Sequence, residues 1–417
     1  SSSRSESGIA ACCGLDARSG RIEIDITKIL RCLPPGASTS LSQKRHGVHM
    51  KGPSKVYFTD LRANPRRNIF DKIDDLLEKV SLDRFGKGTL VAVKLHFGER
   101  GNTSYVSPLY VRRVVDNIKR AGASPFLTDT NTLYVGTRTN SVDHLRTAME
   151  NGFGYMVTGA PVIIADGLRG ETGFKVAVDG EHFKEVTIAR EIVNADAIVV
   201  LTHFKCHELT GFGGALKNVG MGCAAREGKL AQHSNSAPMV YPAGCTGCGE
   251  CAASCPADAI DVGSVASIKP SRCIGCGFCI AVCPEGTIRI QWDETTTKLQ
   301  EKMVEYAKGA LKGKADKSVF MTFITHVSPE CDCYDHNDVP IVPDVGILVS
   351  TDPVAIDQAA ADLVNGQQGF AESAMTTGHE PGGDKFRGVH PAVDWTVQLS
   401  VGQKAGLGSR SYKMEKL

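Results

Sequence analysis

The chain has 417 residues, of which 42% are hydrophobic and 22% are charged, a composition typical of a globular protein with two or three domains. Its 47 basic and 46 acidic residues leave a net charge of +1, which argues against nucleic-acid binding, and no window reaches the ~18 apolar residues of a membrane span. We therefore expect a cytoplasmic protein with no nucleic acid or membrane among its partners.

The first 49 residues differ from the rest. The start is rich in serine. It lacks the positively charged segment and long apolar core that would indicate a signal peptide. Met50 then opens a stretch with the pattern of an amino terminus that runs into a first strand. We expect residues 1–49 to be a disordered or non-native leader. An organelle-targeting segment is the alternative, although such segments are poor in the acidic residues found here.

Short β-rich runs alternate with longer helical stretches from residue 55 onward. The pattern predicts strands at 56–61, 89–97, 126–128, 162–165, 195–204, 318–325 and 345–350. It predicts helices at 68–80, 108–122, 297–313 and 353–364, the last with Asp352 as its cap and Pro353 in its first turn. This alternation predicts an α/β fold, a parallel or mixed sheet with helices on both faces. We expect one α/β domain in two parts, residues 50–239 and 294–417.

Eight of the fifteen cysteines repeat one spacing between the two parts. The first copy is Cys245, Cys248, Cys251 and Cys255, and the second is Cys273, Cys276, Cys279 and Cys283, each followed by proline. With this spacing, bacterial two-cluster ferredoxins bind two [4Fe–4S] clusters, and the last cysteine of each run ligates the other cluster. We therefore assign Cys245, Cys248, Cys251 and Cys283 to cluster one. Cluster two takes Cys273, Cys276, Cys279 and Cys255.

Two other uses of these cysteines fit less well. A zinc ribbon separates two C-x-x-C pairs by a longer spacer, whereas here a third cysteine follows each pair. A disulfide framework does not suit a long chain without a secretory signal. We predict a small α+β two-cluster ferredoxin-like insert at residues 240–293, which exchanges electrons with a redox partner protein, either ferredoxin-like or a reductase.

Polar residues also gather where predicted strands end, and ligands of open α/β sheets bind at strand ends. Lys94 and His96 lie two residues apart and face the same side of a strand, although a buried histidine bonded to backbone explains this pattern equally well. His203, Lys205 and His207 alternate along another strand, a spacing that suits metal ligation or acid–base chemistry.

A glycine-rich turn follows this second strand, at residues 211–222. It predicts a helix start whose free N–H groups bind an anion with the help of Lys217. The alternative is that the glycines serve only turns and packing. Further along, Cys331 and Cys333 suit an additional metal ion, and a pair of reduced thiols or a polar loop is the alternative. Asp357 faces either solvent or the site.

The chain resembles the uncharacterised iron–sulfur centre proteins of the domain-of-unknown-function 362 family. The resemblance rests on residues 93–99, 202–218, 331–333 and 350–357, and it covers about residues 55–410. It implies an α/β domain that carries a two-cluster ferredoxin module, and it implies no settled reaction. A fainter likeness to nickel-dependent lactate racemases rests on a lysine- and histidine-lined site and assigns no role to any residue.

These observations lead to one main hypothesis, an iron–sulfur oxidoreductase. Two [4Fe–4S] clusters would transfer electrons between a partner protein and a small anionic substrate in the α/β domain. The lysines would bind the anion and one histidine would handle a proton. The candidate catalytic residues are Lys94, His96, His203, Lys205, His207 and Lys217. The alternatives are a non-enzymatic electron carrier or iron–sulfur scaffold, and a metal-binding or redox-sensing protein.

Overall fold

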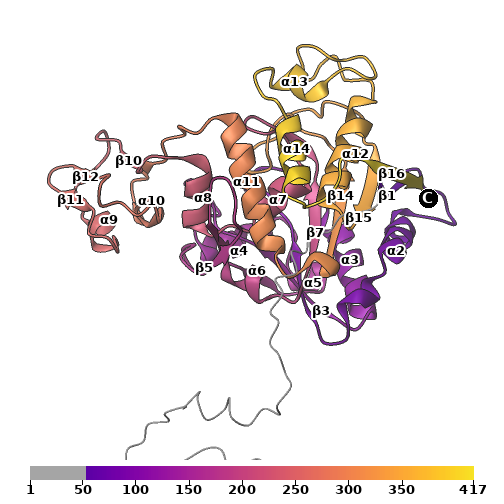
Figure 1. Ribbon diagram of the computed structural model, residues 1–417, viewed down its shortest axis with the longest axis horizontal. Coiled ribbons are helices and arrows are strands. Elements are labelled where there is room, and N and C mark those ends of the chain that lie inside the picture. Colours follow the sequence, from indigo (N-terminus) through magenta and orange to yellow (C-terminus); the bar gives the residue numbers. More distant parts are fainter. Residues whose placement is uncertain (1–52) are drawn as a thin grey trace, which may run out of the picture. The chain divides into compact units, whose positions relative to one another are not determined.

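The computed structural model describes residues 53–417, so the predicted leader lies outside the described residues. An eight-stranded sheet with the order β16-β1-β15-β14-β7-β2-β3-β4 forms its centre (Figure 1). β15 pairs antiparallel with β1 and β14, and every other neighbouring pair is parallel. The predicted α/β fold is confirmed, with a mixed sheet. Its strands are β1 (Ser54–Thr59), β2 (Leu90–Lys94), β3 (Ser124–Asp129), β4 (Val162–Ile164), β7 (Ala197–His203), β14 (Ser318–Ile324), β15 (Gly346–Ser350) and β16 (Tyr412–Lys416).

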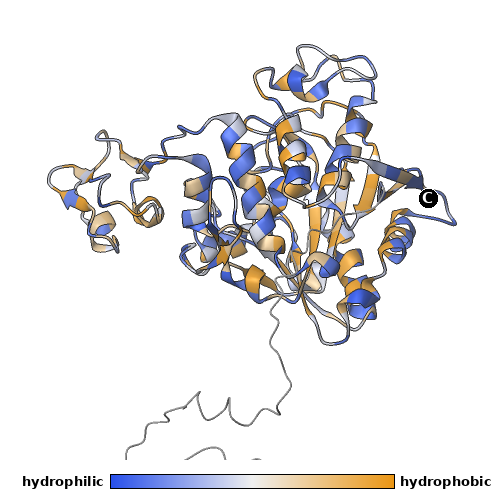
Figure 2. Ribbon diagram, in the orientation of Figure 1, coloured by the Kyte–Doolittle hydropathy of each residue, from blue (hydrophilic) through white to orange (hydrophobic). Residues whose placement is uncertain are grey.

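Helices cover both faces of this sheet. The central strand β7 is buried along its whole length, and its alternate side chains enter two different hydrophobic clusters. Ile198 and Val200 pack on one face and Val199 on the other. Figure 2 shows the central strands mostly in the orange of hydrophobic residues. The first face is covered by α7 (Ala215–Gly220), α11 (Thr296–Leu311) and α12 (Pro353–Asn365), and the second by α2 (Ile69–Val80) and α3 (Pro108–Arg120).

Side-chain caps fix where two of these helices begin. The Asn68 side chain accepts N–H bonds from Phe70 and Asp71, and the Asp71 carboxylate accepts the Asn68 N–H in return. The Asp352 carboxylate accepts the first N–H groups of α12, whose first turn contains Pro353. Both predicted helix starts therefore have the expected physical cause.

Each predicted strand and helix has a counterpart in the structure, but several short elements were not predicted. The strand β16 is charged and mostly exposed, so it lacks the hydrophobic alternation that reveals a strand. The other unpredicted elements are α4 (Ser141–Glu150), α5 (Tyr155–Thr158), α6 (Arg190–Asn194), α8 (Arg226–His233), α13 (Lys385–Val389), α14 (Thr396–Lys404), and the hairpins β5 (Gly173–Ala177) with β6 (Glu185–Ala189) and β8 (Lys205–His207) with β9 (Gly211–Gly213).

The cysteine-rich segment between α8 and α11 has a small hydrophobic cluster of its own. Its two short helices each begin directly after a glycine with positive φ, Gly249 at 85° and Gly277 at 67°. The boundaries predicted for the insert, 240 and 293, stay a prediction. The elements of the segment are β10 (Met239–Val240), α9 (Glu250–Ala253), β11 (Ile260–Val262), β12 (Ala266–Ile268), α10 (Phe278–Val282) and β13 (Ile288–Arg289), with β10 paired to β13 and β11 to β12.

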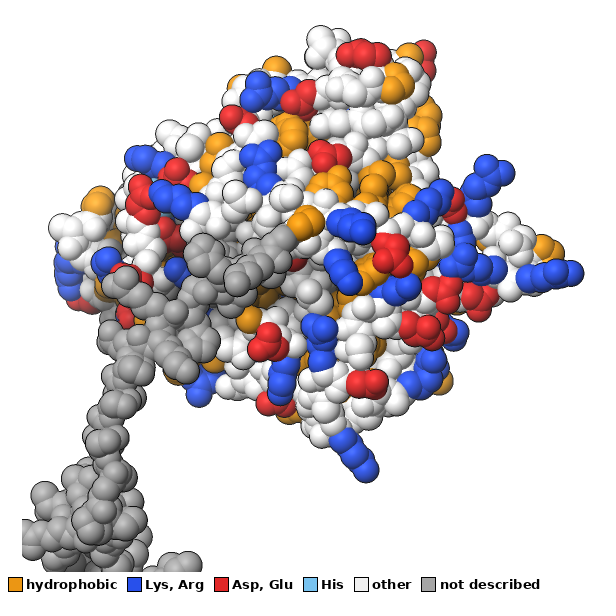
Figure 3. Space-filling model, turned by 45° about the vertical axis from the view of Figure 1, so that its right-hand side comes forward, with side chains coloured by type: hydrophobic (Ala, Val, Ile, Leu, Met, Phe, Trp, Pro, Cys, Tyr) orange, Lys and Arg blue, Asp and Glu red, His pale blue; other side chains and the backbone are white. Residues whose placement is uncertain are grey.

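The surface agrees with the near-zero net charge. On the face drawn in Figure 3, blue basic and red acidic side chains are interspersed among the coloured residues. Within residues 53–417, no helix has the length and apolar character needed to cross a bilayer.

Candidate functional site

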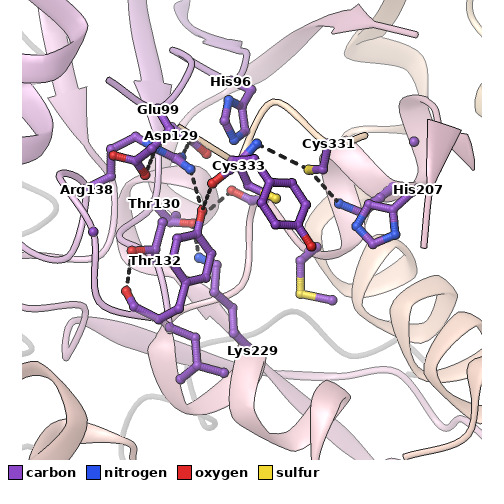
Figure 4. Close-up of a pocket in the computed structure, with 18 of the residues that line it drawn as sticks. His96, Glu99, Asp129, Thr130, Thr132, Arg138, His207, Lys229, Cys331 and Cys333 are labelled. Carbon is purple, nitrogen blue, oxygen red and sulfur yellow. Dashed lines mark hydrogen bonds and ion pairs between the residues drawn. The ribbon is translucent and has the colours of Figure 1, made fainter. Parts of the chain in front are cut away.

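A cavity of about 640 Å³ lies at the carboxyl ends of the central strands (Figure 4). β2 and β7 are neighbours in the sheet. The strands that follow β2 in the chain, β3 and β4, lie on one side of this pair, whereas β14, the next strand of this sheet after β7, lies on the other side. In open α/β sheets, ligands bind at the carboxyl ends of strands where the strand order reverses in this way. The wall of the cavity comes from the ends of β2 and β3, the β8–β9 hairpin, α7, α8 and the loop that contains Cys331 and Cys333.

A buried ionic network joins β2 to β3 on one side of the cavity. The Lys94 Nζ donates to Asn218 Oδ1 at 2.7 Å and pairs with Asp129 Oδ1 at 3.0 Å. Arg138 lies 3.2 Å from Glu99 Oε2 and 3.5 Å from Asp129 Oδ2. Burial opposes ionisation of Asp129, but the charge of Lys94 holds the pKa of this carboxyl below its usual value. Lys94 is therefore a paired cation rather than one available to an anionic ligand.

His96 lines the cavity as a neutral ring. Its Nδ1 accepts the N–H of Gly98 at 2.9 Å, so the ring proton sits on Nε2. Desolvation, helped by the positive charge of Arg138, lowers the pKa of His96 to about 3. At neutral pH His96 is therefore an N–H donor and not a cation. The ring both bonds to the backbone and faces the cavity, so the two alternatives from the sequence hold together.

The three alternating residues predicted on one strand take different positions. Lys205 and His207 line the cavity, but His203 does not. Both ring nitrogens of His203 have partners, because Nδ1 lies 2.7 Å from Asp332 Oδ1 and Nε2 lies 2.8 Å from Thr325 O. Lys205 Nζ donates to Asp332 Oδ2 at 2.8 Å. His203 therefore holds the buried Asp332 carboxylate in place behind the cavity wall, and it does not reach a ligand.

The anion site predicted at the glycine-rich turn is wrong. The turn does lead into a helix, α7, but the N–H groups of Ala215 and Leu216 donate to the Asp357 carboxylate at 2.6 and 2.9 Å. A Cβ on Gly214 would collide with the same carboxylate, so glycine is required there for close approach. Asp357 is fully buried and faces neither solvent nor the cavity. The Asp357 carboxylate thus accepts the helix N–H groups that were predicted to bind an external anion.

Lys217 of α7 instead points at the Cys331 sulfur. Its Nζ lies 3.8 Å from Cys331 Sγ, which also accepts the N–H of Cys333 at 3.4 Å. His207 accepts the Leu209 N–H on Nδ1 at 3.1 Å, and it adds to the influences that lower the pKa of Cys331. The hydrogen bond from the Cys333 thiol, aided by Lys217 and opposed by burial, holds the pKa of Cys331 well below its usual value.

A metal ion at Cys331 and Cys333 stays a prediction. Among the described residues, no three or more His, Cys, Asp or Glu side chains are arranged as a site for a single metal ion. The contacts that the structure does contain are those of a thiolate with a lysine and a second thiol. The alternative of a pair of reduced thiols is therefore the one that these contacts favour.

Several residues of the cavity were not predicted. Lys229 of α8 donates to Ala224 O at 2.9 Å and to Thr130. Burial lowers the pKa of its ammonium group. It forms no ion pair among residues 53–417. His233, four residues later, has a buried Nδ1 without a partner and stands edge-on to Trp292. The i,i+4 spacing of Lys229 and His233 was the available sequence signal.

Comparison with known proteins identifies the family. The model of the family described as "Domain of unknown function (DUF362)" matches residues 91–362. The chain belongs to this family. No curated protein matches it. Two solved structures are similar: the lactate racemase apoprotein from Thermoanaerobacterium thermosaccharolyticum (14% identity, TM-score 0.35, 64% of this chain and 50% of that chain) and a protein from Thermotoga maritima (14%, 0.32, 66% and 55%). This chain thus covers only about half of either one.

The cysteine-rich segment of this DUF362 protein contains two further small cavities, each lined by four cysteines. Backbone N–H groups approach the sulfurs, from Ala266 to Cys245 at 3.4 Å and from Ala259 to Cys255 at 3.3 Å. Four thiols with amide donors to sulfur fit the ligand set of a [4Fe–4S] cluster. The first cavity is lined by Cys245, Cys248, Cys251 and Cys283, and the second by Cys255, Cys273, Cys276 and Cys279.

One loop of this DUF362 protein touches both the large cavity and the cysteine loops. Leu133 and Val135 line the large cavity. Leu133 also belongs to the hydrophobic cluster of the cysteine-rich segment, where a Cβ on Gly277 would lie 3.3 Å from it. A Cβ on Gly286 would lie 3.7 Å from Val135. The loop therefore lies between the large cavity and the second run of cysteines, and its own side chains fill the space.

Proposed function

We propose that this DUF362 protein is an iron–sulfur oxidoreductase that holds two [4Fe–4S] clusters and carries out a redox reaction on a small anionic substrate in the large cavity. The observation that carries the proposal is the grouping of the eight cysteines. They line two cavities in sets of four, and each set takes its fourth cysteine from the other run. This is the grouping that a two-cluster ferredoxin requires.

Among the eight cysteines, Cys283 has donors that stabilise a thiolate, whereas burial raises the pKa of Cys251, Cys276 and Cys279. Desolvation opposes ionisation of the Cys283 thiol. Hydrogen bonds from Thr287 and from nearby backbone N–H groups outweigh this effect and lower its pKa. Glycines with positive φ, such as Gly247 and Gly275, let the loops turn tightly around each cavity. When bound, the clusters supply transfer of one electron at a time.

The large cavity is suited to bind an anion and to move a proton. Lys229 and His233 have polar atoms without an ionic partner among the described residues, so they are the groups that we assign to the anion. His96 and His207 each have Nδ1 occupied by a backbone N–H, so each can present an N–H from Nε2. An external redox partner would act at the cysteine-rich insert. The many unpaired thiols suit a reducing compartment, and we infer a cytoplasmic location.

The test is anaerobic purification of the full chain, followed by iron, sulfide, zinc and nickel analysis and by EPR of the reduced protein. The proposal predicts near eight iron and eight sulfide per chain, the sum for two four-iron clusters. Cys206→Ser is the matched control, because Cys206 is buried away from both cysteine loops and should leave the iron content unchanged. Zinc in place of iron, after strict exclusion of oxygen, would overturn the proposal.

A second experiment distinguishes an enzyme that turns over a substrate from a protein that only carries electrons. Lys229→Met removes a cavity cation that forms no ion pair within residues 53–417, and it leaves every cysteine in place. We expect normal cluster content and normal electron exchange with a small dye, but weakened binding of the anionic substrate. A variant that loses neither substrate binding nor turnover would remove Lys229 from the site.

A further inference from the structure

We propose that Cys331 and Cys333 form a redox-active dithiol on the wall of the large cavity, with Cys331 as the attacking thiolate, and that this dithiol acts on small disulfides that carry carboxylate groups. The proposal names a substrate class for the cavity. It rests on the proposed function only for the source of the electrons that return the dithiol to its reduced form.

The first support is the arrangement around the Cys331 sulfur. It accepts the Cys333 N–H at 3.4 Å, and the Lys217 ammonium lies 3.8 Å from it (Figure 4). The Cys333 thiol is the largest influence that holds the pKa of Cys331 below its usual value. Donors on several sides stabilise a thiolate, and the thiolate is the nucleophilic form of cysteine. The second thiol lies where it can attack a sulfur bound to Cys331.

The second support is the way in which the loop is anchored. Tyr334 N–H donates to Cys331 O at 3.1 Å, which closes a tight turn around the two cysteines. Between them, Asp332 is fixed to the sheet by His203 and Lys205. Tyr134 Oη donates to Cys333 O at 3.2 Å. The loop therefore positions two thiols one residue apart, and a catalytic pair requires such fixed positions.

The other buried cysteines of the α/β domain provide the contrast. Cys206 and Cys223 are also fully buried, but within residues 53–417 neither sulfur forms a hydrogen bond with a lysine as Cys331 does. Burial raises the pKa of Cys223 to about 11 and raises that of Cys206 further. These two are ordinary core thiols. Burial alone thus predicts an inert cysteine, and only the cation and the second thiol distinguish Cys331.

The reaction balances as two exchanges and one reduction. The Cys331 thiolate attacks a substrate disulfide R–S–S–R, forms Cys331–S–S–R and releases R–S⁻. Cys333 then gives up its proton to the released thiolate and attacks Cys331–S–S–R, which forms the Cys331–Cys333 disulfide and releases the second R–S⁻. Two electrons, delivered one at a time, and one proton restore the Cys331 thiolate and the Cys333 thiol. In the proposed function, the [4Fe–4S] clusters are the donor of these electrons.

The cavity favours a small, negatively charged disulfide. Its volume of about 640 Å³ lies in the range of small-molecule sites. Lys217 faces the sulfur that attacks, and Lys229 and His233 offer polar atoms without ionic partners in the described part of the chain. A carboxylate would complete the hydrogen bonds of these buried groups. An ammonium group at the same place would meet a cation instead.

The experiment traps the first exchange. Cys333→Ser protein is incubated anaerobically with dithiodipropionate or with cystamine, two disulfides of similar length that end in carboxylates and in ammonium groups. Peptide mass spectrometry then locates the adduct. We expect a mixed disulfide at Cys331 that forms at least ten-fold faster with dithiodipropionate than with cystamine. Adduct formation at Cys206 to the same extent, no adduct at Cys331, or a preference for cystamine would overturn the proposal.

The wild-type chain supplies the second half of the test. After treatment with dithiodipropionate it should contain a Cys331–Cys333 disulfide, and Cys331→Ser should contain none, with unchanged iron content in both proteins. A chain that forms the disulfide but contains no iron would contradict the proposed function and leave the dithiol intact. A stoichiometric third metal that is lost in Cys331→Ser would overturn the dithiol.

Discussion

The cysteines of the insert and the two cysteines of the large cavity are held in different ways. In the insert, each group of four comes from neighbouring turns, and the donors to sulfur are backbone N–H groups of the same segment. At the cavity, Lys217 approaches Cys331 from an element more than a hundred residues away. The first kind of site can be predicted from the sequence spacing of its own residues. The second exists only after the sheet has formed.

The largest effect should come from breaking the crossed grouping in the insert. Cys255 lies in the first run, but it lines the cavity of the second. We expect Cys255→Ser to lose about four of about eight irons, since a cubane with three ligands is labile. Cys273→Ser should do the same, and the double variant should lose no more than either single one. Iron analysis checks this, and loss of both clusters in the double variant would contradict the crossed assignment.

The next effect concerns the rigidity of the cavity wall. Asp332 is fully buried and pairs with His203 and Lys205. Asp332→Asn leaves the buried Lys205 ammonium without its carboxylate partner, so we expect the free energy of unfolding to fall by about 3 kcal/mol. Asp261→Asn in the insert removes an exposed pair with Lys269 and should cost under about 0.5 kcal/mol. Anaerobic urea unfolding measures both values, and equal losses would contradict the contrast between the two regions.

The same carboxyl sets a pH dependence. Burial opposes ionisation, but His203 and Lys205 lower the pKa of Asp332 below its unfolded value. The unfolded state therefore takes up a proton first as pH falls. The stability that Asp332 contributes is fully present above pH ~4 and is lost below it. Unfolding curves at pH 6 and pH 3 should differ less in Asp332→Asn than in the wild type.

The sequence was a good guide to the sheet. A strand such as β7 is buried on both faces and therefore appears as an unbroken hydrophobic run. The start of α12 was marked by Asp352 and Pro353, because a cap acts on its immediate neighbours. The edge strand β16 was missed because it is exposed and charged. Features fixed by local chemistry were thus the ones that could be predicted.

The cavity was predicted only in part. Lys205, His207 and Lys217 were placed near strand ends, and they do line it. His203 was assigned to the same face, but the chain breaks from β7 to β8 and Asp332 draws the ring away. Asp357 occupies the N–H groups of α7 from a helix that follows 140 residues later in the chain. No local pattern indicates which distant carboxylate will fill a helix start.

A smaller effect tests the charge beside Cys331. Lys217→Met removes the ammonium 3.8 Å from the sulfur, so we expect alkylation of Cys331 by iodoacetamide at pH 6 to slow about ten-fold. With Lys217 present, the thiolate persists and the rate should vary little from pH 6 to 8. Without it, the rate should rise with pH as the thiol ionises. Lys217→Arg keeps the charge and is the matched control, and an unchanged pH profile in Lys217→Met would remove the cation from the explanation.

The smallest effect returns to the insert and concerns a charge that reaches it from the α/β domain. Arg226 is buried, and its Nη1 has no hydrogen-bond partner in the described part of the chain. Its side chain passes within 3.4 Å of where a Cβ on Gly277 would lie, next to Cys276. A buried cation at this place should raise the reduction potential of cluster two and leave that of cluster one nearly unchanged.

Arg226→Met should therefore lower the potential of one cluster by tens of millivolts, on the order expected for a single partly screened charge. Arg226→Lys keeps the charge and controls for lost packing. An EPR redox titration separates the two clusters, because reduction at different potentials gives two steps. If both steps moved together, or if Arg226→Lys shifted them as much as Arg226→Met, the potential would follow from packing. The insert would then be as independent of distant residues as its cysteine spacing implies.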